Sequence, residues 1–218
     1  MLINILLLIS ILLILIAYLN IVLKFIKTKN IKIDNLTGFD LAKELTSNYD
    51  EINIVESRDI NISKYNLKRR VIRLTTKDYN SNNINTLSKI SLLSGYSLIN
   101  LNKDKNIELL AKIFKSIDYL NKSPILAIII SLLVRKIGDA KIALILLIII
   151  SIYQYLINEI NITSKEETTN NLKEIIKDNN YSLLENIQNS YLLLNKISFI
   201  TTLILILRLV LIIINWHQ

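Results

Sequence analysis

LINILLLISILLILIAYLNIVL, from Leu2 to Leu23, is the stretch that decides the fold, because it contains no charged residue. As a helix it is roughly 30 Å long, which is the thickness of the hydrocarbon core of a bilayer. A cleaved signal peptide would begin with basic residues and end a shorter apolar core in small residues, and this stretch does neither. We therefore expect residues 1–23 to form a transmembrane anchor.

Basic residues follow the anchor directly, at Lys24, Lys27, Lys29 and Lys32. Cytoplasmic loops of membrane proteins carry an excess of lysine and arginine. This order therefore predicts that the N-terminus lies outside and that the next segment lies in the cytoplasm. The chain is expected to be a multi-pass protein of the cell membrane.

Further apolar blocks lie after the middle and at the end of the chain. Residues 125–134 and 142–157 flank a basic turn at Arg135–Lys141, and each block is shorter than the roughly 20 residues of a spanning helix. They form either short crossing helices or a re-entrant hairpin. The expected segments are a transmembrane anchor over 1–23, a soluble α+β region over 24–122, a membrane hairpin over 123–157, cytoplasmic helices over 158–196 and a C-terminal transmembrane helix over 197–216.

Local patterns in the soluble region predict a helix, then short strands, then two helices. Thr37 with Asp40 three residues later is typical of a helix N-cap. Alternating apolar residues predict short strands around 52–54 and 60–62, and a third strand with Ile72 and Leu74 on one face. Apolar residues then recur at helical spacing, at Ile84, Leu87, Ile90 and Leu98 and again at Ile107, Leu110, Phe114 and Ile117.

Two capping boxes lie in the segment expected to form cytoplasmic helices. Ser164 precedes Glu167, and Ser182 precedes Glu185, at the spacing at which serine and glutamate cap the start of a helix. Each box predicts that a helix begins there.

The overall composition supports the membrane class. Apolar residues make up 51% of the chain, its mean hydropathy is +0.41, and they gather in blocks instead of recurring evenly. The three glycines and one proline favour long helices. The absence of cysteine excludes disulfides and thiolate metal sites, and a single histidine nearly excludes an imidazole site.

The net charge of +8 is explained by contact with anionic lipid and not by nucleic acid. The densest basic cluster has Tyr65 as its one aromatic residue, whereas nucleic-acid surfaces usually add several stacking aromatics. Lipid headgroup contact or solubility is the better interpretation of this cluster, which comprises Lys64, Lys68, Arg69, Arg70 and Arg73.

Several short strings occur in a fixed order along the chain. They are Thr37-Gly38-Phe39-Asp40-Leu41-Ala42, Ser63-Lys64-Tyr65-Asn66, Val71-Ile72-Arg73-Leu74-Thr75 and Ile157-Asn158-Glu159-Ile160-Asn161. In this order they resemble the TGxEVA, HYDP, VRLS and PVEFDAS motifs of the neutral zinc metallopeptidases of the YugP type, integral-membrane enzymes of the HExxH class. The resemblance implies an α-helical membrane protein with a small α+β cytoplasmic region, which is a zincin-like remnant with terminal transmembrane helices and a central membrane hairpin.

The chain departs from this family at the catalytic motif. The family's HEVGH falls at Leu92-Leu93-Ser94-Gly95-Tyr96. Leu92 has no lone pair for zinc, Leu93 cannot accept a proton, and the phenol of Tyr96 titrates near pH 10. Glu159 stands where the family has its downstream glutamate, and it is either a lone remnant of a third ligand or an interfacial or helix-capping carboxylate. We expect no catalytic residue, no metal and no cofactor.

These observations predict a proteolytically inactive relative of a membrane zinc metallopeptidase. Such a pseudo-enzyme would act in the lipid bilayer as a binding or regulatory partner of an active metallopeptidase relative or of client membrane proteins. Leu92, Leu93 and Tyr96 would form either an apolar contact surface or part of the core.

A standalone structural or lipid-binding membrane protein is one alternative, and a residual membrane hydrolase with a rebuilt site is the other. Ser88-Lys89 is a weak dyad candidate, because adjacent helical residues do not face each other.

Overall fold

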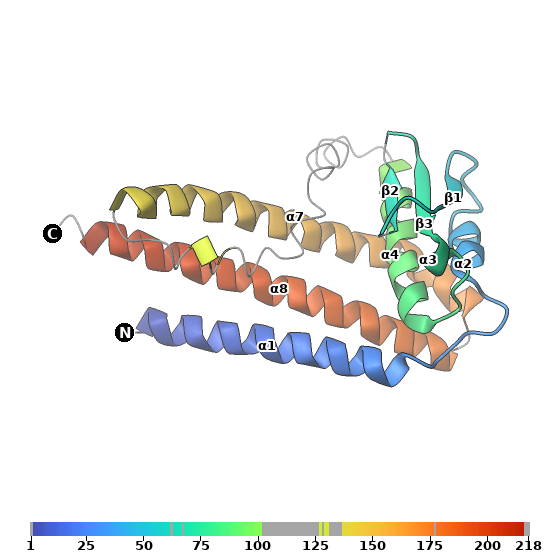
Figure 1. Cartoon of the computed structure of the whole chain (residues 1–218), viewed down its shortest axis with the longest axis horizontal. Coiled ribbons are helices and arrows are strands. Elements are labelled where there is room, and N and C mark those ends of the chain that lie inside the picture. The colour runs from blue at the N-terminus through green and yellow to red at the C-terminus, as the bar shows by residue number, and fades with distance from the viewer. Residues whose placement is uncertain are drawn as a thin grey trace. The chain divides into compact units, whose positions relative to one another are not determined.

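The computed structural model describes residues 2–61, 63–66, 68–101, 127, 129–130, 137–176 and 178–215. Three long helices dominate these ranges: α1 (Leu2–Thr28), α7 (Ile137–Ile175) and α8 (Asp178–Asn215) (Figure 1). The chain divides into two compact units. Unit 1 comprises Met1–Asn20, Phe114–Glu159 and Leu192–Gln218, and unit 2 comprises Ile21–Ile113 and Ile160–Tyr191. Each long helix contributes residues to both units.

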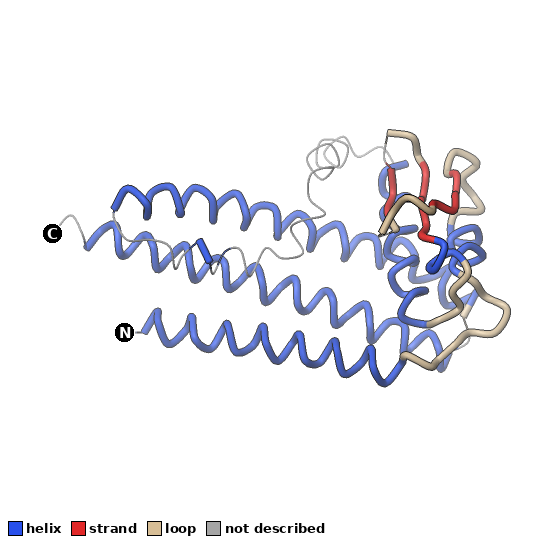
Figure 2. Tube along the Cα trace, viewed as in Figure 1, coloured by secondary structure: helices blue, strands red, loops and turns tan. Residues whose placement is uncertain are grey.

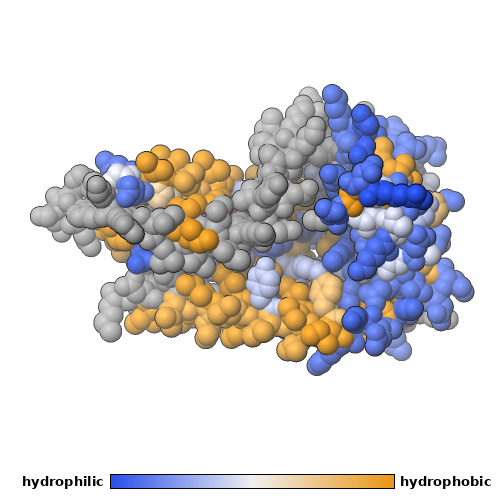
Figure 3. All heavy atoms as spheres, viewed as in Figure 1, coloured by the Kyte–Doolittle hydropathy of each residue, from blue (hydrophilic) through white to orange (hydrophobic). Residues whose placement is uncertain are grey.

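Within the described part of the chain, three helices are long and apolar enough to cross a membrane, and their candidate spans are Leu8–Thr28, Gly138–Ile175 and Asn179–Ile214. Within unit 1, small and branched residues of α7 pack against α8, including Ala143 and Leu147 against Leu205. Large apolar side chains remain exposed on all three helices, and hydrophobic atoms cover the surface over α1 and α7 in Figure 3. Apolar surface of this extent is stable in lipid and not in water. The expectation of a mostly helical chain is confirmed, and these helices suggest a membrane protein.

Unit 2 contains a three-stranded sheet in the order β1 (Asn53–Ser57), β3 (Val71–Thr75), β2 (Lys64–Asn66) (Figure 2). Strand β1 pairs with β3 in parallel, and β2 pairs with β3 in antiparallel fashion. Ile72 lies opposite Ile54 on one side and Tyr65 on the other, so these three side chains share the face that packs into the core. Ile72 and Leu74 are fully buried, which confirms the predicted face of the third strand.

Three helices pack with the sheet. Helix α2 (Gly38–Leu45) begins as predicted, because Thr37 Oγ1 accepts a hydrogen bond from the Asp40 N–H (3.2 Å) and the Thr37 N–H donates to Asp40 Oδ2 (3.0 Å). The short helix α3 (Thr76–Tyr79) leads into α4 (Ile84–Leu101). The predicted helical stripe of α4 is buried in the core, together with residues of α7 and α8; it comprises Ile84, Leu87, Ile90 and Leu98.

The two predicted helix starts between 158 and 196 are wrong. Ser164 lies inside α7 and Ser182 inside α8, so neither can be an N-cap, whose backbone is not helical. The chain contains no glycine or proline after Gly138, so nothing in the sequence interrupts either helix. The expected segment limits at 157/158 and 196/197, which divide membrane from cytoplasmic residues, lie within α7 and α8 and stay predictions.

Two further local expectations differ from the structure. The turn expected over Arg135–Lys141 is helical from Ile137 onward, and Gly138 is exposed in the first turn of α7. No strand forms at Ile60, which lies in the connection from β1 to β2. Most of the first hairpin arm, the expected helix over 107–117 and Ile62 lie outside the described residues.

Candidate functional site

Helix α4 is the central element of unit 2 and bears the positions at which the resemblance places the catalytic motif. Its N-terminal end contacts α1, since Asn85 Oδ1 accepts a hydrogen bond from Thr28 Oγ1 (2.8 Å). Its C-terminal half contacts the sheet, where the rings of Tyr96 and Tyr65 meet edge to face with centroids 5.8 Å apart. Helix α2 packs so closely that a side chain at Gly38 would overlap Ile90. Helix α4 is therefore enclosed by packed elements.

The three positions that the resemblance assigns to zinc ligands and a base are half-buried on α4. Leu93 and Tyr96 pack against the core, and Leu92 is also partly buried. Burial raises the pKa of the Tyr96 phenol from 10.0 to about 12, and the neighbouring Tyr65 adds to this effect. The phenol is thus neutral at pH 7, which is the form that binds metals poorly.

These residues do not fit the zinc ion that the resemblance implies. Two leucines and a neutral phenol supply no ligand set of nitrogen, thiolate or carboxylate donors. Within the described ranges, no group of three histidine, aspartate or glutamate side chains is placed to hold a metal ion. Glu159, the candidate remnant ligand, is an exposed residue of α7 that belongs to unit 1, whereas α4 belongs to unit 2.

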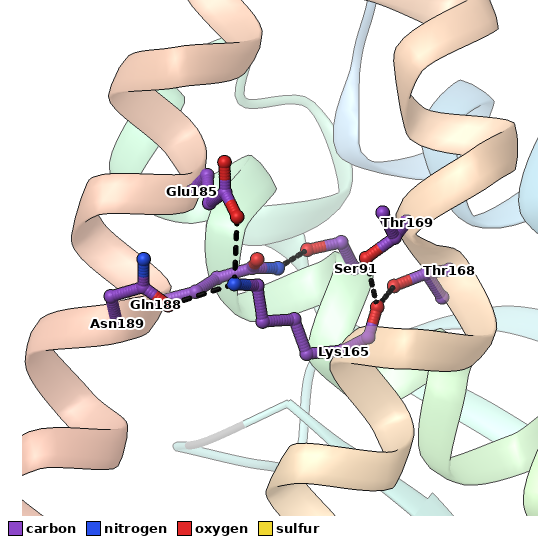
Figure 4. Close-up of polar contacts among 7 residues, drawn as sticks. All are labelled: Ser91, Lys165, Thr168, Thr169, Glu185, Gln188 and Asn189. Atoms are coloured by element: carbon purple, nitrogen blue, oxygen red, sulfur yellow. Dashed lines mark hydrogen bonds and ion pairs between the residues drawn. The ribbon is translucent and has the colours of Figure 1, made fainter.

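A row of serines is the feature of α4 that the sequence reasoning missed. We call Ser88, Ser91, Ser94 and Ser97 the serine row; all four are fully buried. Two of these hydroxyls donate hydrogen bonds to the helix backbone. Ser91 donates to the Ser88 carbonyl (2.9 Å), and Ser97 donates to the Ser94 carbonyl (2.6 Å). Gln188 of α8 donates to Ser91 Oγ (2.7 Å), as Figure 4 shows. The recurrence of serine every three residues was the available signal.

The serine row lies where α4 and α7 approach most closely. A side chain at Gly95 would overlap the backbone of Ser164, so the two helix backbones are in contact at this point. Ser164 is itself buried, and its hydroxyl has no hydrogen-bond partner, like those of Ser88 and Ser94. Small side chains are needed wherever two helices approach this closely. The serine row therefore acts first as a packing surface.

Beside this contact, one lysine joins α7 to α8. Lys165 Nζ donates to Glu185 Oε1 (2.8 Å) and to Asn189 Oδ1 (2.8 Å), and the Lys165 side chain is only 17% exposed (Figure 4). Glu185, which the capping-box pattern assigned to the start of a helix, instead pairs across two helices. A partly buried pair with a second hydrogen bond stabilises the unit by about 1 kcal/mol.

The arrangement does not support nucleophilic chemistry on α4. Ser88 is buried whereas Lys89 is exposed, and the Lys89 ammonium lies 5.4 Å from the centre of the Phe25 ring. The two residues face different surroundings and form no dyad. Lys24 Nζ does donate to Ser190 Oγ (2.6 Å), but Ser190 gives its own proton to the Asn186 carbonyl (2.8 Å) and is 7% exposed. The Ser190 hydroxyl is therefore hydrogen-bonded to its own helix and is not accessible to a substrate.

Comparisons with protein-family models, curated proteins and solved structures found no match to this chain. The resemblance to the YugP-type metallopeptidases therefore stays a prediction from the short strings alone.

Proposed function

We propose that this chain is a non-catalytic membrane protein, a degenerate relative of a membrane zinc metallopeptidase, which acts as a binding or regulatory partner within the membrane. The observation that supports this proposal best is the state of α4. Where a metallopeptidase would present ligands and a base, α4 has partly buried Leu92, Leu93 and Tyr96, and two of these side chains pack against the core. Among the residues that the structure describes, no group of three histidine, aspartate or glutamate side chains is placed to hold zinc.

The partner surface is proposed to lie on the apolar helices and not on α4. The α4 positions are partly or fully buried, with Lys89 the exposed exception among Asn85–Ile99. The helices α1, α7 and α8 instead expose rows of large apolar side chains, such as Leu8 (71%), Ile142 (62%) and Leu207 (57%). A membrane-embedded partner can pack against such surface without competing with water. An active metallopeptidase relative or a client membrane protein would meet the chain there.

The test is purification of the tagged full-length chain from native membranes in a mild detergent. Partners are identified by mass spectrometry, and zinc is measured in the same sample. We expect one membrane protein to co-purify in near-stoichiometric amount, with zinc present only when that partner contains a zinc site. Recovery of the chain alone and free of metal would overturn the partner role and favour a standalone structural or lipid-binding protein.

A reactive-serine probe tests the residual hydrolase, for which the Lys24–Ser190 contact is the one favourable observation. We expect no labelling of the purified chain, because the Ser190 hydroxyl is buried and hydrogen-bonded to the backbone. Labelling that disappears in Ser190→Ala but persists in the buried-serine control Ser97→Ala would contradict the non-catalytic proposal.

A further inference from the structure

The face of the sheet that points away from the core gathers positive charge. Lys64 of β2 lies directly opposite Arg73 of β3, on the face opposite the buried Ile72 and Leu74. Lys68 and Arg69 follow in the turn between these two strands. We call Lys64, Lys68, Arg69 and Arg73 the basic sheet face; the first three are exposed and Arg73 is half-buried. The surface over the sheet is mostly hydrophilic in Figure 3.

The turn between β2 and β3 has a defined local structure and contains one basic residue that is paired. Asn66 Oδ1 accepts a hydrogen bond from the Arg69 N–H (3.2 Å), and Arg70 adopts a positive φ of 52°, which is uncommon for a residue with a side chain. The Arg70 side chain forms an ion pair with Glu51. Of the five basic residues in this segment, the fold thus neutralises one. Among the residues that the structure describes, no carboxylate forms an ion pair with the other four.

Positive side chains that lie side by side without a carboxylate partner favour the binding of an anion from outside the protein. Like charges directly opposite on neighbouring strands repel one another, and Lys64 and Arg73 are such a pair. An anionic group between them would relieve the repulsion and form charge-assisted hydrogen bonds with both. The remaining side chains of this face are small, polar or aliphatic; they are Asn53, Val55, Ser57, Asn66, Val71 and Thr75.

We propose that the basic sheet face binds the headgroups of anionic lipids in the membrane that holds the apolar helices. Helices α1, α7 and α8 each contain residues of both units. Val55, paired with Arg73 in the neighbouring strand and 40% exposed, adds an apolar side chain that suits the edge of the headgroup layer. The absence of an aromatic residue on this face disfavours single-stranded nucleic acid, which stacks on such residues. This inference rests on the membrane location and not on the loss of catalysis.

The experiment uses the full-length chain in nanodiscs of phosphatidylcholine with and without phosphatidylglycerol. Since the natural chain has no cysteine, Asn53→Cys places a single fluorescent label at an exposed position of the same sheet face, on strand β1. A water-soluble quencher then reports whether the label is covered. We expect protection in the anionic discs alone, and loss of that protection at high salt, because salt screens exposed charges.

Two charge-matched variants in the labelled background separate local binding from net charge. Lys64→Gln with Arg73→Gln removes two charges from the face, and Lys43→Gln with Lys77→Gln removes two exposed charges on α2 and α3. We expect the ratio of covered to uncovered label to fall at least about tenfold in the first pair and little in the second, since each basic residue at an anionic surface contributes about 1 kcal/mol. Circular dichroism checks that both variants are folded.

Three results would overturn the proposal. Equal protection in neutral and anionic discs would mean that charge does not hold the face to lipid. An equal loss in both variant pairs would assign the effect to net charge. Protection in neutral discs by added inorganic phosphate or polyglutamate, with none from phosphatidylglycerol, would identify a soluble anion as the ligand.

Discussion

Because α4 and α7 are in contact at Gly95, Gly95→Ala should lower the stability of the protein, whereas Gly138→Ala should raise it. The added methyl group in Gly95→Ala would overlap the backbone of Ser164, which cannot rotate away as a side chain could, so the helices must separate. Overpacking of this kind costs roughly 1–3 kcal/mol, with a rigid backbone contact at the upper end. Alanine recovers about 1 kcal/mol of helix propensity. The net loss is therefore about 2 kcal/mol.

Gly138→Ala is the matched control within the same protein. Gly138 also lies in a helix, but a methyl group there meets no atom within 4 Å. We expect this variant to gain about 0.5–1 kcal/mol, because alanine loses less conformational entropy on folding than glycine. The two variants make the same chemical change and should move stability in opposite directions.

Thermal unfolding of the purified chain in detergent, followed by circular dichroism, measures both variants. A change of 1 kcal/mol shifts the midpoint by roughly 2–4 °C in a chain of this size. We expect Gly95→Ala to unfold several degrees below the natural chain and Gly138→Ala to unfold slightly above it. If Gly95→Ala were as stable as Gly138→Ala, the close approach of α4 and α7 would be refuted.

Three other predictions concern charge, titration and topology. Lys165→Met should lower stability by about 1 kcal/mol through loss of both Lys165 contacts, whereas exposed Lys89→Met should change it less, in urea unfolding monitored by circular dichroism. Because burial raises the folded-state pKa of Tyr96 from 10.0 to about 12, the free energy of unfolding should fall as the pH rises from 10 to 12; in urea unfolding across this range, Tyr96→Phe should make that fall smaller by up to about 2 kcal/mol. Asn30→Cys should react with an impermeant thiol reagent only from the cytoplasmic side of sealed vesicles, and reaction from outside would reverse the proposed orientation.

The parts of the fold that the sequence predicted depend on residues close together in the chain. The cap of α2 needs only Thr37 and Asp40, which bond to each other. The buried face of β3 follows from the alternation that places Ile72 and Leu74 together. Leu2–Leu23 has no charge along its whole length, so the membrane class is readable without any tertiary contact.

The errors share a physical cause, which is that a local motif has more than one structural use. Serine followed by glutamate three residues later can cap a helix, but each residue of the pair also has uses inside a helix. Ser164 is small enough for the backbone contact with Gly95, and Glu185 reaches Lys165 on the neighbouring helix. Neither partner is near in sequence. The length of α7 and α8 was better indicated by the missing glycine and proline than by the capping motifs.

The sequence predicted the chemistry of the candidate site but not its packing, for the same reason. Leu92, Leu93 and Tyr96 could be identified as non-ligands from their side-chain chemistry alone, but their packing against the core required the structure. The serine row is the feature of this helix that only the structure revealed. The hydroxyls of Ser91 and Ser97 donate to the α4 backbone, Ser91 also accepts a hydrogen bond from Gln188, and the small side chains of the row lie beside the contact of Gly95 with α7. A helix that must fit closely against α7 on one side and the sheet on the other has little freedom to open toward a substrate. A binding role in the membrane is compatible with that constraint, because the apolar faces of α1, α7 and α8 can engage a partner while α4 stays packed.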